Sequence, residues 1–271
     1  GFWIEHKGEE KEDENGNIEL VKRRDVGNIP EHQLGYFYIQ EAASMIPPLV
    51  LQPKPGDMVL DMCASPGSKT TQIGMYMDNE GILVANDYKY DRIKSLGLNV
   101  QRCGLSNCVI TLMMGHLLSK LQENNKEGVF DKILVDAPCS GTGTIRKSLK
   151  TLRIWNPNVV RRIAGQQKQL IDTGFKLLKK GGTLVYSTCT LEPEEDEGII
   201  SWLLDKYDGE SEESKCMKAK VEKIELKGLV RSKPIMEFEG TKYNSKVKDC
   251  LRIWPQDNNT EGFFVCKIQK I

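Results

Sequence analysis

The sequence predicts an α/β fold in which a mostly parallel sheet is covered by helices on both faces. Three observations lead to this prediction: short apolar runs alternate with helical stretches from residue 58 to residue 205, several of these runs end in an aspartate or a cysteine, and two further apolar runs lie near the end of the chain. Strands that alternate with helices are typical of a parallel sheet, because each crossover helix packs on one of its faces. With 271 residues, the chain is long enough to bury a large core.

The expected elements follow in order along the chain. Short apolar runs indicate strands at residues 58–63, 81–86, 108–113, 130–135 and 183–186. Helical patterns cover residues 69–77, 91–102, 158–180 and 194–205. The pair Gly181-Gly182 follows the longest helix and is interpreted as its stop signal. Upstream, residues 40–45 look helical before Pro47-Pro48, whereas the lysine- and glutamate-rich segment 206–248 receives no assignment.

Both ends of the chain differ from this alternating pattern. The apolar runs 251–254 and 262–268 are interpreted as an antiparallel hairpin that completes a seven-stranded sheet. Residues 1–29 are polar, with a turn signal at residues 14–17, and are expected to form a peripheral hairpin, an arm or the remnant of an upstream region. The chain lacks a starting Met, which indicates a fragment of a longer protein. The main domain is therefore expected to span residues 30–271.

Composition narrows the class of protein. Lys plus Arg equals Asp plus Glu, so the net charge is zero and gives no global signal for nucleic acid. The chain has no apolar run of about eighteen residues and no signal-peptide layout at its start, which argues against a membrane or secreted protein. The eight cysteines form no C-x-x-C and have no His pair beside them, so a zinc site and a disulfide framework are both disfavoured. A reducing, intracellular compartment fits best.

A basic stripe interrupts the balanced charge between Thr144 and Lys180. It holds ten basic residues against one acid, Asp172. Such a stripe is either a local phosphate-binding surface or an ordinary solvated helix face, and charge alone leaves both interpretations open. The basic residues are Arg146, Lys147, Lys150, Arg153, Arg161, Arg162, Lys168, Lys176, Lys179 and Lys180.

The residues at the ends of the predicted strands carry the candidate chemistry. In an open α/β sheet, ligands bind beyond the carboxyl ends of the strands. Carboxylates and two cysteines are therefore expected to meet at one edge of the sheet, with simple packing of the cysteines as the alternative. The strand ends in question are Asp61-Met62-Cys63, Asp87, Asp136-Ala137-Pro138-Cys139 and Ser187-Thr188-Cys189.

The stretch DMCASPGSKT at residues 61–70 combines a strand end, a turn of small residues and a helix start. Such a turn lets backbone N–H groups approach a carboxylate or a phosphate at the helix N-terminus. Its spacing is neither that of a P-loop nor G-x-G-x-x-G. Asp87, after the next strand, is suited to accept hydrogen bonds from two ribose hydroxyls, which NAD and S-adenosylmethionine both offer. The alternatives are an ordinary βα turn and a helix N-cap at Asp87.

In these motifs the sequence resembles the Nop/Sun group of RNA cytosine-5 methyltransferases. The resemblance covers about residues 29–271. It implies a Rossmann-like, S-adenosylmethionine-dependent methyltransferase fold over residues 30–271, in the cytoplasm or, in a eukaryote, the nucleus or nucleolus. It further implies a monomer that binds RNA, either tRNA or rRNA, without a metal and without a membrane. The segments that carry it, in the family's order, are DMCASPGSKT at 61–70, FDKILVDAPCSGTGTIRK at 130–147, YSTCTLEPEEDE at 186–197 and LRIWPQDNNTEGFFVCKI at 251–268.

The resemblance assigns roles residue by residue. Cys189 would attack carbon 6 of the cytosine, which makes carbon 5 electron-rich enough to take a methyl group, and Cys139 would help release the product by eliminating Cys189. Asp136 would hydrogen-bond the base edge, with Lys69 nearby. The target base must be unstacked, and the basic stripe with Trp155 would hold the RNA phosphates. The cofactor S-adenosyl-L-methionine would be held by Cys63, Ala64, Ser65, Pro66, Gly67, Ser68, Lys69, Asp87, Arg92 and Asp136.

Two departures from the family pattern are visible. Ser65 and Ser68 replace an alanine and a glycine of the usual cofactor turn, and both are small enough to keep it. Residues 111–116, after the third strand, contain no acid where many members contact the adenine amino group, so apolar contacts or backbone are expected to hold adenine. The alternatives are an inactive RNA-binding assembly factor and a DNA cytosine-5 methyltransferase in which Cys139 attacks. The presence of Cys189 argues against the second alternative.

Overall fold

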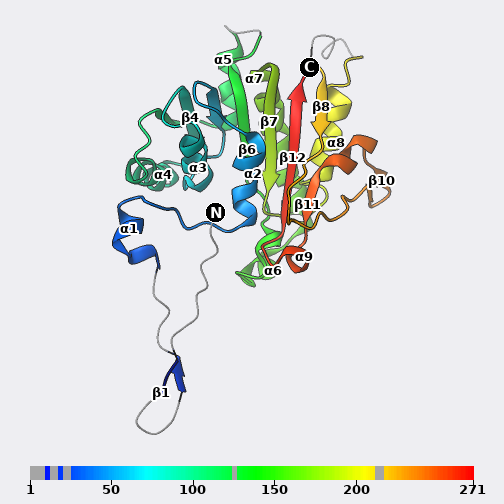
Figure 1. Cartoon of the computed structure of the whole chain (residues 1–271). Coiled ribbons are helices and arrows are strands. Elements are labelled where there is room, and N and C mark those ends of the chain that lie inside the picture. Colours follow the sequence, from blue (N-terminus) through cyan, green and yellow to red (C-terminus); the bar gives the residue numbers. More distant parts are fainter. Residues whose placement is uncertain (1–9, 13–17, 21–25, 124–126, 211–216) are drawn as a thin grey trace. The chain divides into compact units, whose positions relative to one another are not determined.

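A mixed sheet organises residues 40–271, which form one of the two units of the chain; the other is residues 1–39. The computed structural model describes residues 10–12, 18–20, 26–123, 127–210 and 217–271. Over these residues the sheet has eight strands in the order β11-β12-β7-β6-β3-β4-β5, with β8 paired to β12 (Figure 1). The strands are β3 (Met58–Asp61), β4 (Ile82–Asp87), β5 (Cys108–Leu112), β6 (Phe130–Asp136), β7 (Leu178–Thr188), β8 (Ala219–Glu222), β11 (Leu251–Ile253) and β12 (Phe263–Lys270).

The topology of this sheet matches the sequence prediction. Strands β5, β4, β3, β6 and β7 are parallel neighbours. Strand β12 runs antiparallel to β7 and to β11, which confirms the C-terminal hairpin. The path of seven strands is extended by β8, which lies in the segment left unassigned and pairs with β12. A separate two-stranded pair joins β9 (Glu237–Phe238) and β10 (Thr241–Lys242).

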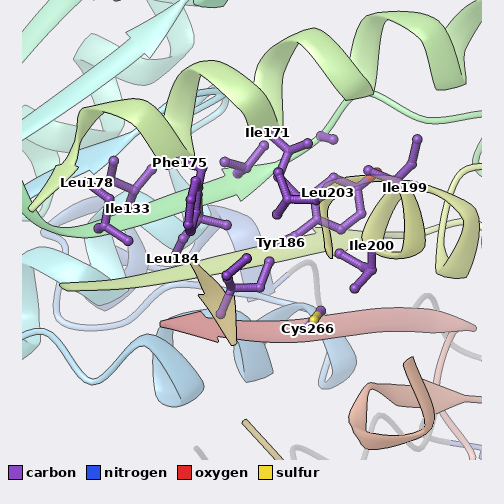
Figure 2. Packing of buried hydrophobic residues seen from close by; sticks show 14 of the residues in the cluster. Ile133, Ile171, Phe175, Leu178, Leu184, Tyr186, Ile199, Ile200, Leu203 and Cys266 are labelled. Atoms are coloured by element: carbon purple, nitrogen blue, oxygen red, sulfur yellow. The ribbon is translucent and has the colours of Figure 1, made fainter. Parts of the chain in front are cut away.

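Helices cover both faces of the sheet, and side chains alternate along each central strand between the two layers. Leu184 and Tyr186 of β7 pack in one cluster with Phe175 of α7 (Pro157–Leu177) and with α8 (Glu197–Lys206), as Figure 2 shows. Val185, between them, belongs to the opposite cluster with α2 (Ile46–Leu51) and α3 (Ser68–Tyr76). Each fully buried side chain of this size contributes roughly 1.5–3 kcal/mol. The strand ends are therefore held by a core on both sides.

The remaining helices are short or peripheral. Helix α4 (Tyr90–Arg102) packs through Leu96 and Val100 against Ala85 of β4. In the described ranges, no helix is both long and apolar enough to cross a membrane. The other elements of this unit are η2 (Ala43–Met45), η3 (Gly115–Ser119), α5 (Lys120–Glu123), η4 (Thr142–Thr144), α6 (Lys150–Ile154), η5 (Ser245–Asp249) and α9 (Pro255–Asn258).

The unit of residues 1–39 contains the expected hairpin as β1 (Glu10–Glu12) paired antiparallel with β2 (Ile18–Leu20). The turn signal at residues 14–17 lies outside the described residues. The unit continues with η1 (Val26–Asn28) and α1 (Pro30–Gln33).

One local prediction was right only in part and another was wrong. Of the helix expected at residues 40–45, Ala43–Met45 forms the 3₁₀ helix η2, and the α-helix follows at Ile46–Leu51 with Pro47 and Pro48 in its first turn, where a missing N–H costs no helical hydrogen bond. Helix α7 ends at Leu177 and β7 starts at the next residue, so Gly181-Gly182 does not stop the helix. The two glycines lie where four residues of β7 stand opposite one residue of β6, and Gly181 has a positive φ of 79° there.

A buried cluster of charges joins β11, α8 and the loop that follows β7. Arg252 is fully buried and donates to Glu197 from Nε (2.8 Å), to Asp196 from a terminal nitrogen (3.0 Å) and to the carbonyl oxygen of Leu191 (3.1 Å). Thr188 donates to the same Asp196. A buried charge is tolerated only when it is paired and hydrogen-bonded, so Arg252 keeps two buried carboxylates and the chain after β7 in place.

We expect Arg252→Ala to lower the free energy of unfolding by about 3–5 kcal/mol, because Asp196 and Glu197 then remain buried without a cation. Urea denaturation of both proteins measures the difference. Lys223→Ala is the matched control, because Lys223 pairs with Glu225 on the surface and its loss should leave unfolding nearly unchanged. Equal effects of the two substitutions would contradict the structural role given to the buried cluster.

Candidate active site

The carboxyl ends of β3, β6 and β7 bring the candidate residues together. The parallel register places Asp136 opposite Ser187, so the chains that follow β6 and β7 leave the sheet side by side. Cys139 lies three residues beyond β6 and Cys189 one residue beyond β7. Their sulfur atoms are 3.3 Å apart. The two cysteines that the sequence placed at neighbouring strand ends are therefore in direct contact.

Hydrogen bonds between the two loops fix this contact. The amide of Gly143 donates to the carbonyl oxygen of Cys189 (3.0 Å), and the amide of Leu191 donates to Thr142 Oγ1 (2.9 Å). Thr190 shares hydrogen bonds with Thr142 and with Ser140. A Cβ atom at Gly143 would overlap the carbonyl oxygen of Gly262 and lie 2.8 Å from that of Cys189. Only glycine fits there, which explains the small residues after Cys139.

The two thiols have different electrostatic surroundings. The hydrogen bond from Cys139, helped by the charge of Lys69, lowers the pKa of Cys189 despite burial. The same hydrogen bond, together with burial and the charge of Glu195, raises the pKa of Cys139 well above its ordinary value. The arrangement favours Cys189 as thiolate and Cys139 as the thiol that keeps its proton. A lowered pKa beside a cation is the typical setting of a nucleophilic cysteine.

Lys69 and Asp136 form an ion pair at the strand ends. Lys69 Nζ lies 2.8 Å from Asp136 Oδ2 and donates to Ser44 Oγ at 2.9 Å. Ser187 donates to the other oxygen of Asp136 at 2.7 Å. Burial alone would lower the pKa of Lys69, but the Asp136 carboxylate outweighs it and raises that pKa. Asp136 is thus held as an acceptor beside the thiols, and a carboxylate has lone pairs left for a further donor.

A cavity of about 80 Å³ opens beside this ion pair. Asp136 and Lys69 line one part of it, and the turn after β3 lines the rest. Seven of the ten residues predicted to hold a cofactor therefore line one cavity. The lining residues are Asp61, Cys63, Ala64, Ser65, Pro66, Ser68, Lys69 and Asp136.

Three predicted cofactor residues stand outside this lining and shape the turn. Asp87 is buried and accepts a hydrogen bond from the amide of Ser65 (3.3 Å). Arg92 donates to the carbonyl oxygen of Ser65 (2.6 Å) and lies 3.6 Å from Asp87. Gly67 has a positive φ of 107° just before α3, and a Cβ atom there would press on Leu96. The turn is therefore preorganised by neighbours from β4 and α4.

Asp61 was expected at the strand ends from the sequence, but no catalytic or cofactor-binding role was assigned to it. Its Oδ2 accepts from Thr70 at 2.8 Å, whereas its buried Oδ1 has no hydrogen-bond partner in the described part of the chain. Burial raises the pKa of Asp61 to about 7, the nearby Asp136 adds to the rise, and Thr70 opposes it. An unpaired buried oxygen that faces a cavity indicates a missing donor or cation. The available signal was an acid directly at the end of a buried apolar run.

Residues 111–116, at and after the end of β5, contain no acidic side chain. Asn86 donates to the carbonyl oxygens of Met62 (3.1 Å) and Met113 (3.0 Å) and accepts from Thr111 (2.9 Å). Met114 follows and is half exposed. Asn86 thus ties three strand ends together, and the surface beyond β5 exposes the apolar side chain of Met114.

The basic stripe separates into paired and unpaired residues. Lys176 pairs with Asp172 and Lys179 with Asp131. Arg161 lies 3.7 Å from Glu239. Lys150, Arg153 and Arg162 are exposed and make no ion pair with any described residue. Three residues in the later part of the stripe are therefore paired within the protein.

Comparison with known proteins gives consistent matches. The family model described as 16S rRNA methyltransferase RsmB/F matches residues 48–269. The tRNA (cytosine(49)-C(5))-methyltransferase of Pyrococcus abyssi is 45% identical over 92% of this chain and 76% of its own length. The ribosomal RNA small subunit methyltransferase F of Shewanella piezotolerans is 42% identical over 95% of this chain. The chain spans 51% of that bacterial relative.

Solved structures resemble the chain as well. A methyltransferase homolog protein from Pyrococcus horikoshii has a TM-score of 0.73 at 35% identity and aligns over 93% of this chain and 74% of its own. The structure of NSun6 from Pyrococcus horikoshii with SFG has a TM-score of 0.75 at 30% identity, over 93% of this chain and 58% of its own.

We expect Cys189 to react with iodoacetamide faster than Cys139 at neutral pH, because its thiolate is the favoured one. Cys139→Ala should slow the alkylation of Cys189 by about tenfold for each unit that the pKa rises once the donor is lost. Mass spectrometry of labelled peptides over time measures both rates. Cys103→Ala, which removes a thiol outside the site, should change neither. Faster labelling of Cys139 than of Cys189 would refute the assigned asymmetry.

Proposed function

The chain belongs to the 16S rRNA methyltransferase RsmB/F family, and from this premise we propose that it methylates carbon 5 of a cytosine in RNA through a covalent adduct with Cys189. The predicted Rossmann-like methyltransferase fold is confirmed by the sheet topology and by the similarity to the methyltransferase homolog. The observation that carries the proposal is the contact of 3.3 Å between two thiols of opposite pKa shift. The named relatives act on tRNA and on rRNA, so RNA is the proposed substrate class.

The two thiols suit a reaction in two stages. The Cys189 thiolate adds to carbon 6 of the cytosine, which places the electron pair at carbon 5 and makes that carbon nucleophilic. After methyl transfer, solvent water takes the proton from carbon 5, the electron pair of that C–H bond restores the ring double bond, and the bond from sulfur to carbon 6 breaks with its electrons returning to Cys189 as a thiolate. Cys139, in contact with Cys189, assists this elimination by donating a hydrogen bond to the departing sulfur. Protonated Cys139 also stabilises Cys189 before attack and after release.

Asp136 and Lys69 are proposed to hold the base. Addition at carbon 6 spreads negative charge to ring nitrogen N3 and makes it more basic, so that N3 takes up a proton, and the fixed Asp136 carboxylate lowers the barrier by accepting a hydrogen bond from this N3–H. The ion pair of 2.8 Å and the donor Ser187 keep Asp136 in one orientation. The reacting base must leave its stack, so an unpaired or flipped cytosine is the expected substrate.

The residues that line the cavity suit the amino-acid end of S-adenosylmethionine, which supplies an electrophilic methyl group when it is bound. Its ammonium group would satisfy the unpaired Oδ1 of Asp61, and its carboxylate would be received by backbone N–H groups at the start of α3. Asp87 is proposed for the ribose hydroxyls, with Arg92 beside it. The exposed side chain of Met114 offers the adenine ring an apolar contact in place of a carboxylate.

The two alternative functions would make different demands on this site. A DNA-type reaction would need Cys139 as the nucleophile, and its raised pKa disfavours that role. An inactive assembly factor would retain RNA binding without cofactor binding, and the neutral surface at Met114 is the feature that favours it. The cysteines described by the structure are all free, which suits a reducing compartment such as the cytoplasm.

We expect Cys189→Ala to abolish methyl transfer and to form no covalent complex with RNA, because no thiolate remains to attack. Cys139→Ala should instead accumulate a covalent protein–RNA complex, because elimination is slowed after addition. Denaturing gel electrophoresis with labelled RNA and cofactor measures both. Cys103→Ala is the matched control and should behave like the parent protein. Activity in Cys189→Ala, with no adduct in Cys139→Ala, would overturn the assignment.

We expect cofactor binding to weaken as the pH falls through about 7, because only the ionised Asp61 carboxyl can pair with an ammonium group. With a pKa of about 7, the ionised fraction falls about tenfold between about pH 8 and about pH 6. Isothermal titration with S-adenosylmethionine measures the affinity at each pH.

Asp61→Asn should bind more weakly at high pH and lose this pH dependence, whereas Asp78→Asn, at an exposed turn, should keep both. A pH-independent affinity in the parent protein would contradict the role of Asp61. The absence of any cofactor binding would favour the assembly-factor alternative.

A further inference from the structure

We propose that the exposed segment 146–155, which includes α6, is the surface on which the RNA strand beside the target cytosine docks. Trp155 stacks a neighbouring base, and Lys150 and Arg153 bind phosphates. The inference rests on the proposed function, because it adds a substrate-positioning surface to the same site. The occupant is a single-stranded nucleotide segment, whose bases offer flat faces and whose backbone carries negative charge.

Helix α6 has no face that packs into the core. None of its side chains is buried. The apolar residues on and beside it are half exposed or more, from 49% for Trp155 to 66% for Leu149, with Leu152 and Ile154 between these values. A surface helix normally turns its apolar side chains inward, so a group of exposed ones marks a surface that binds something.

The positive charge of this segment favours a polyanion such as nucleic acid over a neutral apolar partner. Lys150 and Arg153 alternate with the exposed apolar residues and make no ion pair with any described residue. The sequence contains no acid from Thr144 to Ile171. Cations interleaved with an aromatic and aliphatic side chains are the pattern by which proteins hold single strands, because phosphates meet the cations and bases stack on the ring.

Arg146 differs from Lys150 and Arg153 because its guanidinium group is bound within the protein. It donates to the carbonyl oxygen of Thr260 (3.0 Å) and to Asn259 Oδ1 (2.8 Å). These contacts attach the start of the segment to the loop before β12. Arg146 therefore supports the surface and does not serve as one of its phosphate ligands.

The segment is joined directly to the cysteine loops. Trp155 Nε1 donates to Glu192 Oε1 at 3.0 Å, and Glu192 lies three residues after Cys189. At the other end, the amides of Lys147 and Ser148 donate to the carbonyl oxygen of Thr144, within the loop that follows Cys139. A base stacked on Trp155 would consequently belong to the nucleotides that flank the attacked cytosine.

The test measures binding of a short, fluorescently labelled single-stranded RNA with one cytosine, by fluorescence anisotropy at several salt concentrations. We expect Trp155→Ala to weaken binding about ten- to a hundredfold, the effect of one lost aromatic–base stack. Trp155→Phe should restore most of the affinity, because a phenyl ring still stacks although the hydrogen bond to Glu192 is gone. Thermal melting of each variant verifies that it is folded.

The double variant Lys150→Ala/Arg153→Ala should reduce the slope of log affinity against log salt by about 1.4, which is about 0.7 for each phosphate contact on a single strand. Lys180→Ala is the matched control. Lys180 belongs to the same basic stripe and is exposed, but it lies at the opposite end of β7 from Cys189. It should leave the slope unchanged.

The outcomes separate this inference from the proposed function. A parent protein that methylates RNA, with Trp155→Ala binding RNA unchanged, overturns the surface alone and indicates another partner for the apolar side chains. A parent protein that binds RNA through Trp155 but transfers no methyl group overturns the proposed function and supports the surface. Equal loss of slope in Lys180→Ala and the double variant, or no RNA binding by the parent protein, overturns the surface.

Discussion

The parallel pairing of β6 with β7 is the constraint on which the site depends. Because Asp136 and Ser187 lie in register, the loops that carry Cys139 and Cys189 start level and lie beside one another. Close backbone approach at Gly143 and the hydrogen bonds of Thr190 then bring the sulfur atoms to 3.3 Å. The buried cation of Arg252 fixes the chain after β7 by donating a hydrogen bond to the carbonyl oxygen of Leu191. The register of the sheet therefore positions the two loops, and the packing of the loops brings the two thiols into contact.

Burial gives this arrangement its chemical asymmetry. In a site of low dielectric constant, a nearby charge shifts a pKa more than it would in water. The hydrogen bond between the two thiols lowers the pKa of Cys189 and raises that of Cys139, and the charges of Lys69 and Glu195 act in the same two directions, so two identical side chains acquire opposite pKa shifts. The same burial leaves Asp61 with an unpaired oxygen beside the cavity. The energetic cost of these buried charges is offset by the apolar layers on both faces of the sheet.

Much of this organisation was predictable from sequence. Periodicity alone located the strands that lead to Asp61, Asp136 and Cys189, because buried strands and crossover helices have distinct local patterns. The details that failed depend on contacts between distant segments. Proline in the first turn of α2 and the glycine pair inside β7 have the same local signature as a helix end. Strand β8 is formed by pairing with β12, which local sequence does not encode.

The site residues divide in the same way. Cysteines at strand ends were visible in the sequence, whereas the unpaired oxygen of Asp61 is a property of the fold, because it depends on what surrounds the carboxyl group. The basic stripe shows the limit most clearly: a run of like charges in sequence separates, in the structure, into cations paired near the end of α7 and exposed ones around α6. Only three-dimensional placement distinguishes the two sets.

The central claim is that Cys189, and not Cys139, bonds to the base. The most direct measurement is peptide mapping by mass spectrometry after reaction with cofactor and an RNA that carries 5-fluorocytidine at the target position. Fluorine at carbon 5 blocks the final elimination and traps the adduct on whichever cysteine attacked. The account requires the nucleotide to be attached to the peptide that contains Cys189. Attachment to the peptide of Cys139, or no attachment in a protein that methylates ordinary cytosine, would contradict it.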